Sequence, residues 1–305
     1  MIPAAVRESL ERAFGDRVAF DVSLARHTSL LVGGPADAIA TPADRAELSA
    51  LLRLCREHHL PHQLLGSGFN TLVRDGGIDG VLVRLAKLRR LEERPGARLR
   101  AEAGVSHSQI TRFCSGRGLS GFEFGAGVPG TVGGWLAMNA GVPQQAIGSR
   151  VEELEVMSPS GRCIRHLPRS GLRFVYRALR GLAPGSVLLS ALLSVTLSTP
   201  SAVREEVDRQ LSRRAGTQPL DIPTCGSVFK NPPGDHAGRL IEAAGLKGHR
   251  IGGAEFSPMH ANFIANTGGA SASDVLALIE HAQKTVLIQS GILLAPEVRV
   301  IGRPI

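Results

Sequence analysis

The sequence predicts a mixed fold of the α+β class, built from two or three domains. Its 305 residues exceed what one hydrophobic core usually organises. Segments with strand-like alternation are interleaved with segments of helical periodicity along most of the chain. Hydrophobic residues make up 43% and charged residues 20%, a balance typical of a globular protein with a sizeable core.

The N-terminal part predicts a helix, a pair of strands and a second helix. Residues 1–17 form a short amphipathic pattern of mixed charge, which does not resemble a secretory signal. Residues 20–40 alternate around a Gly-Gly-Pro turn, which predicts two strands. Residues 41–44, Thr-Pro-Ala-Asp, predict a helix start, and this helix ends before Pro61.

The middle of the chain predicts further strands around one helix. Alternation in residues 79–105 predicts strands, and Ser106 opens a helix. A hairpin is predicted in residues 151–167. Residues 186–197 predict a buried strand, since they fall short of the ~20 residues that cross a bilayer.

The C-terminal part predicts mostly helices. A helix rich in Arg and Glu ends near Gly216, where four prolines and several turn formers mark a boundary. Two helices follow, at residues 236–244 and 273–289. Ser271 and Asp274 are a capping pair for the second of them. Residues 293–302 predict a last strand.

The charge composition favours a small anionic ligand. The net charge is +8, but the basic residues are scattered and the chain has one Trp and one Tyr. Nucleic-acid binding would favour clustered charge with interleaved aromatic residues. A nucleotide phosphate accounts for the same sign of charge.

Cysteine and histidine usage predicts a cytoplasmic protein without a metal site. The four cysteines lack a CxxC pair or disulfide-like spacing and are predicted to be small buried side chains. His58, His59 and His62 lie where a helix ends and complement its dipole, and no Cys or carboxylate cluster completes a metal site.

Three loops carry the candidate chemistry. The first, Gly66-Ser67-Gly68-Phe69-Asn70, joins two strands and is either a phosphate-binding nest or an ordinary turn. The second, residues 127–134, holds several glycines ahead of a stretch that can start a helix with free N–H groups facing an anion. A tight packing turn is the alternative there. Two phosphate-type loops suggest a dinucleotide lying between two subdomains.

The third loop, residues 224–232, contains a candidate reactive hydroxyl. Ser227 follows a glycine, which favours an accessible side chain, and Lys230 and Asn231 add a cation and an amide. A capping serine is the alternative interpretation.

In this order, these loops resemble the UDP-N-acetylenolpyruvoylglucosamine reductase (MurB) family, in its shorter type. The resemblance extends from about residue 24 to residue 302. It is carried by HTSLLVGGPAD (27–37), LLGSGFNTLV (64–73), GVPGTVGGWLAMNAG (127–141), VYR (175–177), TQPLDIPTCGSVFKNP (217–232), AGRLIEAAGLKGHRIGGAEFSPMHANFIANTG (237–268) and APEVRVIG (295–302).

The resemblance implies a vanillyl-alcohol-oxidase-like (PCMH-type) FAD-binding fold with a C-terminal α+β substrate-binding domain. The expected parts are FAD-binding subdomain 1 (1–85), FAD-binding subdomain 2 (86–216, with the final strand 292–305) and the substrate-binding domain (217–291). A monomer is expected, without membrane attachment.

The implied activity is an NADPH-dependent reduction in peptidoglycan precursor synthesis. The enolpyruvyl ether of UDP-N-acetylglucosamine becomes UDP-N-acetylmuramate, with hydride from reduced FAD and a proton from Ser227. Arg177 and Glu297 match the family's other two catalytic positions and would hold the substrate carboxylate. Another FAD-dependent oxidoreductase of the superfamily and a non-catalytic FAD- or nucleotide-binding relative stay open.

The resemblance also implies two sets of binding residues. The FAD contacts are Gly66, Ser67, Gly68, Asn70, Thr71, Gly127, Pro129, Gly130, Thr131, Gly133, Gly134 and Asn139. The substrate contacts are Lys230, Asn231, Arg213, Arg214 and Tyr176.

The chain departs from the family pattern at several positions. Leu179 stands where a serine is usual, which affects the expected hydrogen bonding around Arg177. Leu31, Trp135 and Met259 also differ from the usual residue types, and none of them removes a predicted catalytic group.

Overall fold

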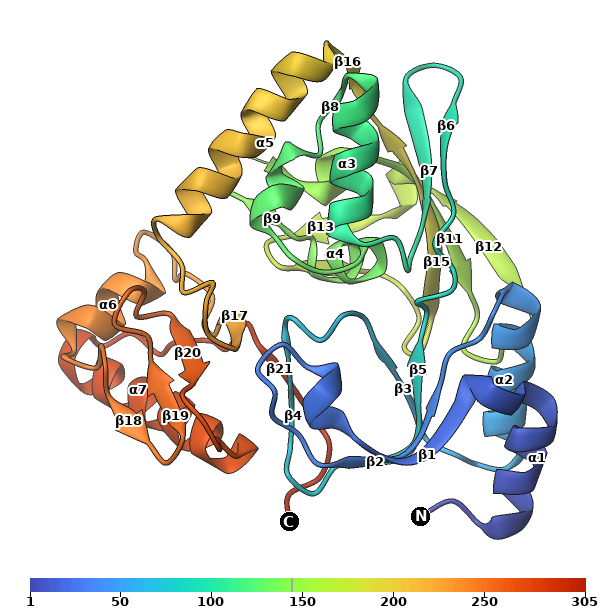
Figure 1. Cartoon of the computed structure of the whole chain (residues 1–305), viewed down its shortest axis with the longest axis horizontal. Coiled ribbons are helices and arrows are strands. Elements are labelled where there is room, and N and C mark those ends of the chain that lie inside the picture. The colour runs from blue at the N-terminus through green and yellow to red at the C-terminus, as the bar shows by residue number, and fades with distance from the viewer. Residues whose placement is uncertain (144) are drawn as a thin grey trace. The chain divides into compact units, whose positions relative to one another are not determined.

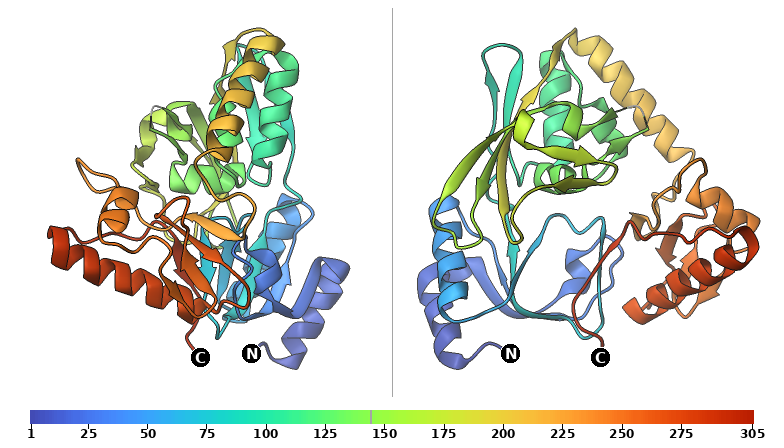
Figure 2. Two further views of the ribbon diagram at one scale, coloured as in Figure 1. Left: turned by 60° about the vertical axis from the view of Figure 1, so that its left-hand side comes forward. Right: turned by 180° about the vertical axis from the view of Figure 1, so that it is seen from behind.

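The computed structural model describes residues 1–143 and 145–305, which divide into two compact units. The first unit comprises Met1–Phe20, Ala38–Gly66 and Gly80–Arg214. The second comprises Asp21–Asp37, Ser67–Asp79 and Ala215–Ile305. Each unit is therefore assembled from segments far apart in the sequence, and Figures 1 and 2 show their elements. The expected three-part division of the chain stays a prediction.

The main sheet of the first unit has five antiparallel strands in the order β12-β11-β15-β7-β6. Their bounds are β6 Leu91–Arg94, β7 Arg98–Glu102, β11 Val151–Met157, β12 Ile164–Pro168 and β15 Val187–Ser194. One face packs against α3 (His107–Arg117) and α4 (Val132–Met138), and Phe124 and Trp135 fill the core between them. The hairpin predicted in residues 151–167 is β11 and β12, and the buried strand predicted in 186–197 is β15.

A second sheet has the strand order β1-β2-β5-β3, and β3 and β5 run parallel. The strands are β1 Val18–Ser23, β2 Pro35–Ala40, β3 His62–Leu65 and β5 Ile78–Arg84. The helices α1 (Ala4–Phe14) and α2 (Arg45–Glu57) bury Leu10, Phe14, Leu48 and Leu52 in the adjoining core. The N-cap of α2 is Asp44, whose side chain accepts from Glu47 N, so this helix begins after the Thr-Pro pair.

The remaining elements of the first unit are short, apart from the exposed helix α5. They are η1 Gly15–Arg17, β8 Leu119–Ser120, η3 Glu123–Gly127, β9 Gly141–Val142, β10 Gln145–Ala146, η4 Ile147–Ser149, η5 Arg169–Gly171, β13 Arg173–Val175, β14 Ala178–Arg180, β16 Thr196–Leu197 and α5 Pro200–Ala215.

The second unit is built on the sheet β17-β20-β19-β18, against which α6 and α7 pack. Its elements are η2 Leu24–His27, β4 Thr71–Val73, β17 Thr224–Ser227, α6 Ala237–Ala243, β18 Arg250–Ile251, β19 Ala254–Phe256, β20 Phe263–Asn266, α7 Ala272–Ser290 and β21 Arg299–Ile301. Ser271 and Asp274 form the predicted capping box of α7, and Gly291 ends this helix in the left-handed conformation.

The last strand pairs with an early one. β21 runs parallel to β4, with Arg299 opposite Thr71 and Ile301 opposite Val73. This pairing lies within the second unit, and it differs from the expectation that the final strand joins residues 86–216.

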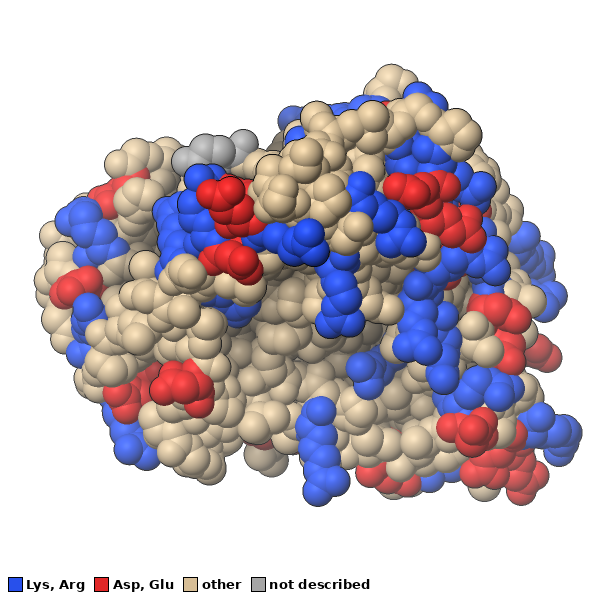
Figure 3. Space-filling model, turned by 45° about the horizontal axis from the view of Figure 1, so that its top comes forward, with Lys and Arg blue, Asp and Glu red and all other residues tan. Residues whose placement is uncertain are grey.

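The surface charge follows the composition. On the face drawn in Figure 3, Lys and Arg side chains are dispersed and acidic side chains lie among them. Among the described residues, no helix is long and apolar enough to cross a membrane.

Three of the four cysteines are buried, as predicted. Burial raises the pKa of Cys55 to about 11 and the pKa values of Cys114 and Cys225 to about 12. Cys163 is exposed beyond the turn of the β11–β12 hairpin, so the expectation of burial is wrong there.

Candidate active site

The first glycine of the 66–70 loop lies against the second glycine-rich loop. A Cβ atom added to Gly66 would stand 3.1 Å from Thr131 Oγ1. Both residues belong to the first unit, so β3 brings the end of one predicted phosphate loop beside the other. This close approach favours glycine at position 66.

Gly68 serves packing within the second unit. Its φ is +71°, and a Cβ atom there would lie 2.2 Å from the carbonyl oxygen of His27. The Gly68 carbonyl accepts hydrogen bonds from both the backbone N–H and the hydroxyl of Ser29. A packing role therefore exists at this glycine alongside its predicted contact with FAD.

The second loop offers room beside a backbone without side chains. Among the described residues, no atom beyond its chain neighbours lies within 4 Å of a Cβ built on Gly127. Gly130 has a φ of +137°, a conformation that L side chains rarely adopt. A glycine loop of this kind, adjoining open space and the Gly66 turn, fits the diphosphate of a dinucleotide such as FAD.

The N–H groups at the start of α4 are already bonded within the protein. Each of the first four donates to a group in the first unit. The bonds run from Val132 to Val105 O (2.9 Å), from Gly133 to Ala103 O (2.9 Å), from Gly134 to Thr131 Oγ1 (3.4 Å) and from Trp135 to Thr131 O (2.8 Å). The expectation that free N–H groups of this helix face an anion is therefore wrong. They join α4 to the end of β7 instead.

His107 and Arg214 lie near the second loop. The His107 N–H donates to Gly130 O at 3.0 Å, and Gly130 N donates to His107 Nδ1 at 3.4 Å. Burial lowers the pKa of His107, and the positive charge of Arg214 lowers it further. Burial also lowers the pKa of Arg214. Of the two arginines predicted to bind phosphate, Arg214 is thus close to the predicted FAD loop.

Asn139, Tyr176 and Arg177 come together around the β13–β14 hairpin. Tyr176 and Arg177 form its turn, and the Arg177 guanidinium lies 5.0 Å from the Tyr176 ring centroid. Arg177 Nη1 donates to Gly141 O at 3.2 Å. Asn139 Nδ2 donates to Val175 O at 2.9 Å, so the helix end after α4 is tied to the same hairpin.

Leu179 has a packing role in this hairpin. It stands opposite Phe174 in the β13–β14 register, and both side chains pack against the core of the first unit. The residue that replaces the usual serine therefore contributes apolar contact.

Ser227 and Glu297 lie on adjoining backbone segments of the second unit. Glu297 N donates to Val228 O at 2.7 Å, immediately after Ser227. Gly226, with a φ of +74°, interrupts the β17–β20 ladder just before Ser227. The Ser227 side chain is half-buried, and its hydroxyl makes no hydrogen bond with the residues that the structure describes.

Two further predicted residues help to build this region. Asn70 Nδ2 donates to the Glu297 carbonyl at 3.1 Å, and Arg299 N donates to Asn70 O. The turn predicted to contact FAD therefore also fixes the backbone of Glu297. Asn231 Oδ1 accepts from Ala237 N at 3.0 Å, at the start of α6.

The sequence analysis missed two residues that hold Ser227 in place. The Ser29 hydroxyl donates to Thr224 O at 2.6 Å, 195 positions away, and to Gly68 O at 3.2 Å. Asn262 bonds to the backbone of Phe229 through its side chain. Ser29 lies inside the quoted segment 27–37 and Asn262 inside 237–268, but sequence spacing gave no sign of their partners.

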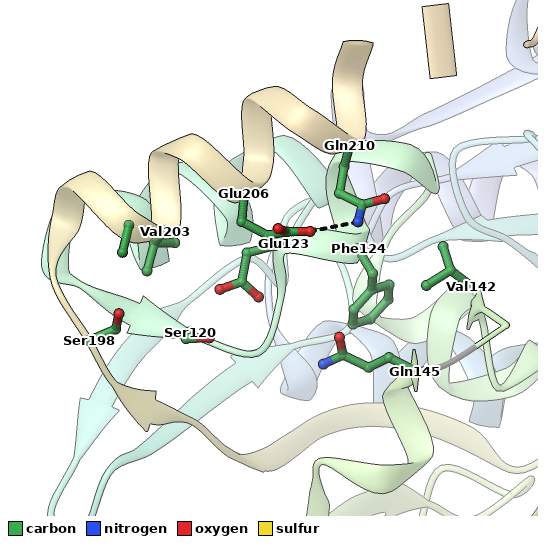
Figure 4. Close-up of a pocket in the computed structure, with 10 residues that line it drawn as sticks. Ser120, Glu123, Phe124, Val142, Gln145, Ser198, Val203, Glu206 and Gln210 are labelled. Carbon is green, nitrogen blue, oxygen red and sulfur yellow. Dashed lines mark hydrogen bonds between the residues drawn. The ribbon is translucent and has the colours of Figure 1, made fainter. Parts of the chain in front are cut away.

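A cavity of about 350 Å³ in the first unit lies away from the predicted residues (Figure 4). It opens between α5 and the β8–η3 segment, and its walls include Glu123, Phe124, Glu206 and Gln210. Glu123 Oε2 accepts from Gly121 N at 2.7 Å, and Gln210 donates to Glu206. No residue predicted to bind FAD or substrate lines this cavity.

A second cavity, of about 640 Å³, adjoins the start of α2 and is lined mainly by charged side chains, among them Arg45, Glu155 and His166. None of the predicted site residues lines it either.

The fold and its loops define a flavoprotein. Residues 36–166 match the model of the FAD binding domain family, and residues 218–301 match that of the UDP-N-acetylenolpyruvoylglucosamine reductase C-terminal domain. The predicted FAD-binding fold with an additional C-terminal domain is thereby confirmed.

Relatives over nearly the whole chain identify the family. The UDP-N-acetylenolpyruvoylglucosamine reductase of Geobacter metallireducens is 46% identical over 282 residues, covering 92% of this chain and 93% of the relative. That of Nitrosococcus oceani is 46% identical and covers 93% and 94%. The crystal structure of MurB from Thermus caldophilus superposes with a TM-score of 0.79 at 33% identity, covering 92% and 97%. The chain belongs to the UDP-N-acetylenolpyruvoylglucosamine reductase family.

Proposed function

We propose that this chain is an FAD-dependent reductase that converts the enolpyruvyl ether of UDP-N-acetylglucosamine to UDP-N-acetylmuramate, with NADPH as electron donor. Family membership over 92% or more of the chain supports the reaction and the cofactor. The observation that carries the proposal is the pairing of the Ser227 and Glu297 segments, joined at Val228 O, with a Ser227 hydroxyl that no described residue occupies.

FAD is held by two loops in this proposal. Bound FAD supplies the hydride that reaches the vinyl CH₂ carbon of the substrate. The crowded position of Gly66, the open space at Gly127 and the conformation of Gly130 support a diphosphate at these turns. The proposed contacts are Gly66, Ser67, Gly68, Asn70, Thr71, Gly127, Pro129, Gly130, Thr131, Gly133, Gly134 and Asn139.

Ser227 is the proposed proton donor. A hydroxyl is a weak acid in water, but it becomes adequate beside a strongly basic enolate that is held close and shielded from solvent. Hydride addition to the CH₂ carbon leaves negative charge on the carbon beside the carboxylate, and Ser227 Oγ delivers its proton there.

The substrate carboxylate is held by Arg177 and Glu297 in this proposal. The guanidinium of Arg177 presents two parallel donors that match a carboxylate. Protonated Glu297 would donate to the same group and stabilise the developing charge. Contacts with Gly141, Tyr176 and Asn70 support a fixed orientation of these two residues.

The diphosphate of the substrate is assigned to basic and amide side chains. We propose Lys230, Asn231 and one of Arg213 or Arg214, with Tyr176 as a further contact. The net charge of +8 is consistent with an anionic substrate. The proposed protein acts as a cytoplasmic monomer in peptidoglycan precursor synthesis, with the three-part domain division given above.

An anaerobic flavin titration tests the function. The purified protein should absorb near about 450 nm, bleach with NADPH, and recover its colour on addition of enolpyruvyl-UDP-GlcNAc. Bleaching without recovery favours another FAD-dependent oxidoreductase. A protein that takes up FAD and does not bleach with NADPH favours the non-catalytic alternative.

A further inference from the structure

We propose that Asn262 is a positioning residue for the protonation step, because its side chain fixes the backbone that carries Ser227 and Glu297. This inference rests on the proposed function, in which Ser227 delivers the proton. It adds a residue that never touches substrate but sets the direction from which the proton arrives.

The amide of Asn262 takes the place of a missing strand partner. Its Oδ1 accepts from Phe229 N at 2.9 Å, and its Nδ2 donates to Phe229 O at 2.8 Å. One side chain thus satisfies both polar backbone groups of one residue, as a neighbouring strand would. The side chain is 4% exposed, so water does not readily replace these bonds.

This clamp stands where the regular ladder is irregular. β17 pairs with β20 at Thr224–Ala265 and at Ser227–Phe263, with a register shift between these pairs. Gly226, at a φ of +74°, turns the backbone within that irregular stretch. Val228 N donates to Asn262 O at 2.9 Å, and the side-chain bonds of Asn262 then hold the following residue. The backbone is thereby pinned immediately after Ser227.

The same short segment is held from its other side by the segment that contains Glu297. Val228 O accepts from Glu297 N at 2.7 Å and from Val298 N at 3.2 Å, and Lys230 N donates to Ala295 O at 2.9 Å. Residues 228–230 therefore lie between Asn262 and the Glu297 segment, all within the second unit. A change at Asn262 shifts both proposed catalytic residues together.

Two substitutions separate this role from simple packing. Asn262→Asp keeps the size and one acceptor but places a negative oxygen against Phe229 O. Asn262→Leu keeps the volume and removes both bonds. The matched control is Asn266→Asp, four residues further along β20, whose amide donates to Leu30 O and accepts from Gly268 and Ala270 without touching residues 227–230.

Each half-reaction is measured separately by anaerobic stopped-flow on the FAD-loaded proteins. Both Asn262 variants should be reduced by NADPH within about twofold of the wild-type rate. Reoxidation by enolpyruvyl-UDP-GlcNAc should slow by about tenfold to a hundredfold, the scale of a small misplacement of a reacting group. The solvent deuterium isotope effect on reoxidation should rise in these variants, because proton delivery is the step that has been slowed. Asn266→Asp should match the wild type in all three measurements.

The outcomes are decisive in either direction. Wild-type reoxidation rates in the Asn262 variants, or equal losses in both half-reactions, overturn the positioning role. Failure of both variants to hold FAD also overturns it, since the residue is then only structural; if Asn262→Leu alone fails, Asn262→Asp decides. A wild-type protein that bleaches but never recovers contradicts the proposed function itself.

Discussion

At the scale of the residue, the proposed chemistry depends on one hydroxyl and its surroundings. The Ser227 side chain is half-buried and makes no hydrogen bond with the described residues, so its proton is not committed to a protein acceptor. Ser29, Asn70 and Asn262 fix the neighbouring backbone by side-chain hydrogen bonds. Such an arrangement suits a group that must meet a reacting carbon without reorganising.

Replacing Ser227 by alanine tests the assignment of the proton donor. Ser227→Ala should retain FAD and bleach with NADPH at the wild-type rate, because the hydroxyl takes no part in that step. Recovery of the colour with substrate should slow by at least about a hundredfold, the usual order for loss of a positioned acid. Stopped-flow absorbance measures both rates.

The matched control is Ser290→Ala, whose hydroxyl bonds only to Val286 O within α7. It should behave like the wild type in both half-reactions. If Ser227→Ala turns over normally, the proton comes from another group.

Side-chain roles differ in how far the sequence could predict them. Ser227, Arg177 and Glu297 were identified because each lies in a segment that resembles the family. Ser29 and Asn262 were not, since their partners lie 195 and 33 residues away and become neighbours only through the fold. No local pattern encodes such a contact.

At the scale of the element, the second loop joins cofactor binding to α4. Its glycines differ in what a side chain would meet. Gly130 has a φ of +137°, so a valine there strains the backbone whether or not FAD is present. Gly127 has no positive φ and no described atom within 4 Å of its Cβ, so a valine there meets only what binds in the loop.

Gly127→Val should therefore weaken FAD binding without unfolding the apoprotein. We expect the Kd for FAD to rise at least about tenfold, which corresponds to about 1.4 kcal/mol. Flavin fluorescence on titration of the apoprotein measures this change, and circular dichroism checks the fold.

Gly171→Val is the control, because its surroundings are equally open and its φ is ordinary. Full FAD affinity in Gly127→Val would refute the loop assignment. Gly130→Val should also lose FAD, but its backbone strain makes it the less specific test.

Elements with local signals were predicted well, and those set by distant partners were not. The capping boxes at Ser106 and Ser271 lie where the sequence starts the helices α3 and α7. The N–H groups of α4 were expected to be free, but they bond to Ala103 and Val105, about thirty residues earlier. The length and pairing of the last strand likewise depend on β4, which no local pattern reveals.

At the scale of the whole molecule, buried charge ties helices to sheets. Arg45 on α2 makes two bonds to Glu155 on β11, at 2.5 and 2.7 Å, and Ser190 donates to the same carboxylate at 2.5 Å. Burial by itself raises the pKa of Glu155, but the hydrogen bonds from Ser190 and Arg45 outweigh it, and the pKa is lowered from its usual 4.5. The folded state therefore favours the ionised carboxylate.

This network should make stability depend on pH in a defined direction. Because the folded pKa of Glu155 is below the unfolded value of 4.5, its stabilisation is complete above that pH and is lost as the pH falls through the folded pKa. Arg45→Met should lower the free energy of unfolding by about 2 kcal/mol at about pH 7, since it leaves a buried carboxylate with fewer partners. The loss should shrink at about pH 4, where the wild type begins to lose the same contribution.

Urea denaturation of the FAD-loaded protein at both pH values measures the two free energies. Arg53→Met serves as the control, because Arg53 is exposed on the same helix and makes no ion pair among the described residues. It should change stability little at either pH. An equal loss for Arg45→Met at both pH values would mean that the arginine stabilises the fold through packing of its aliphatic stem, and the ionised Glu155 would not be what holds α2 to the sheet.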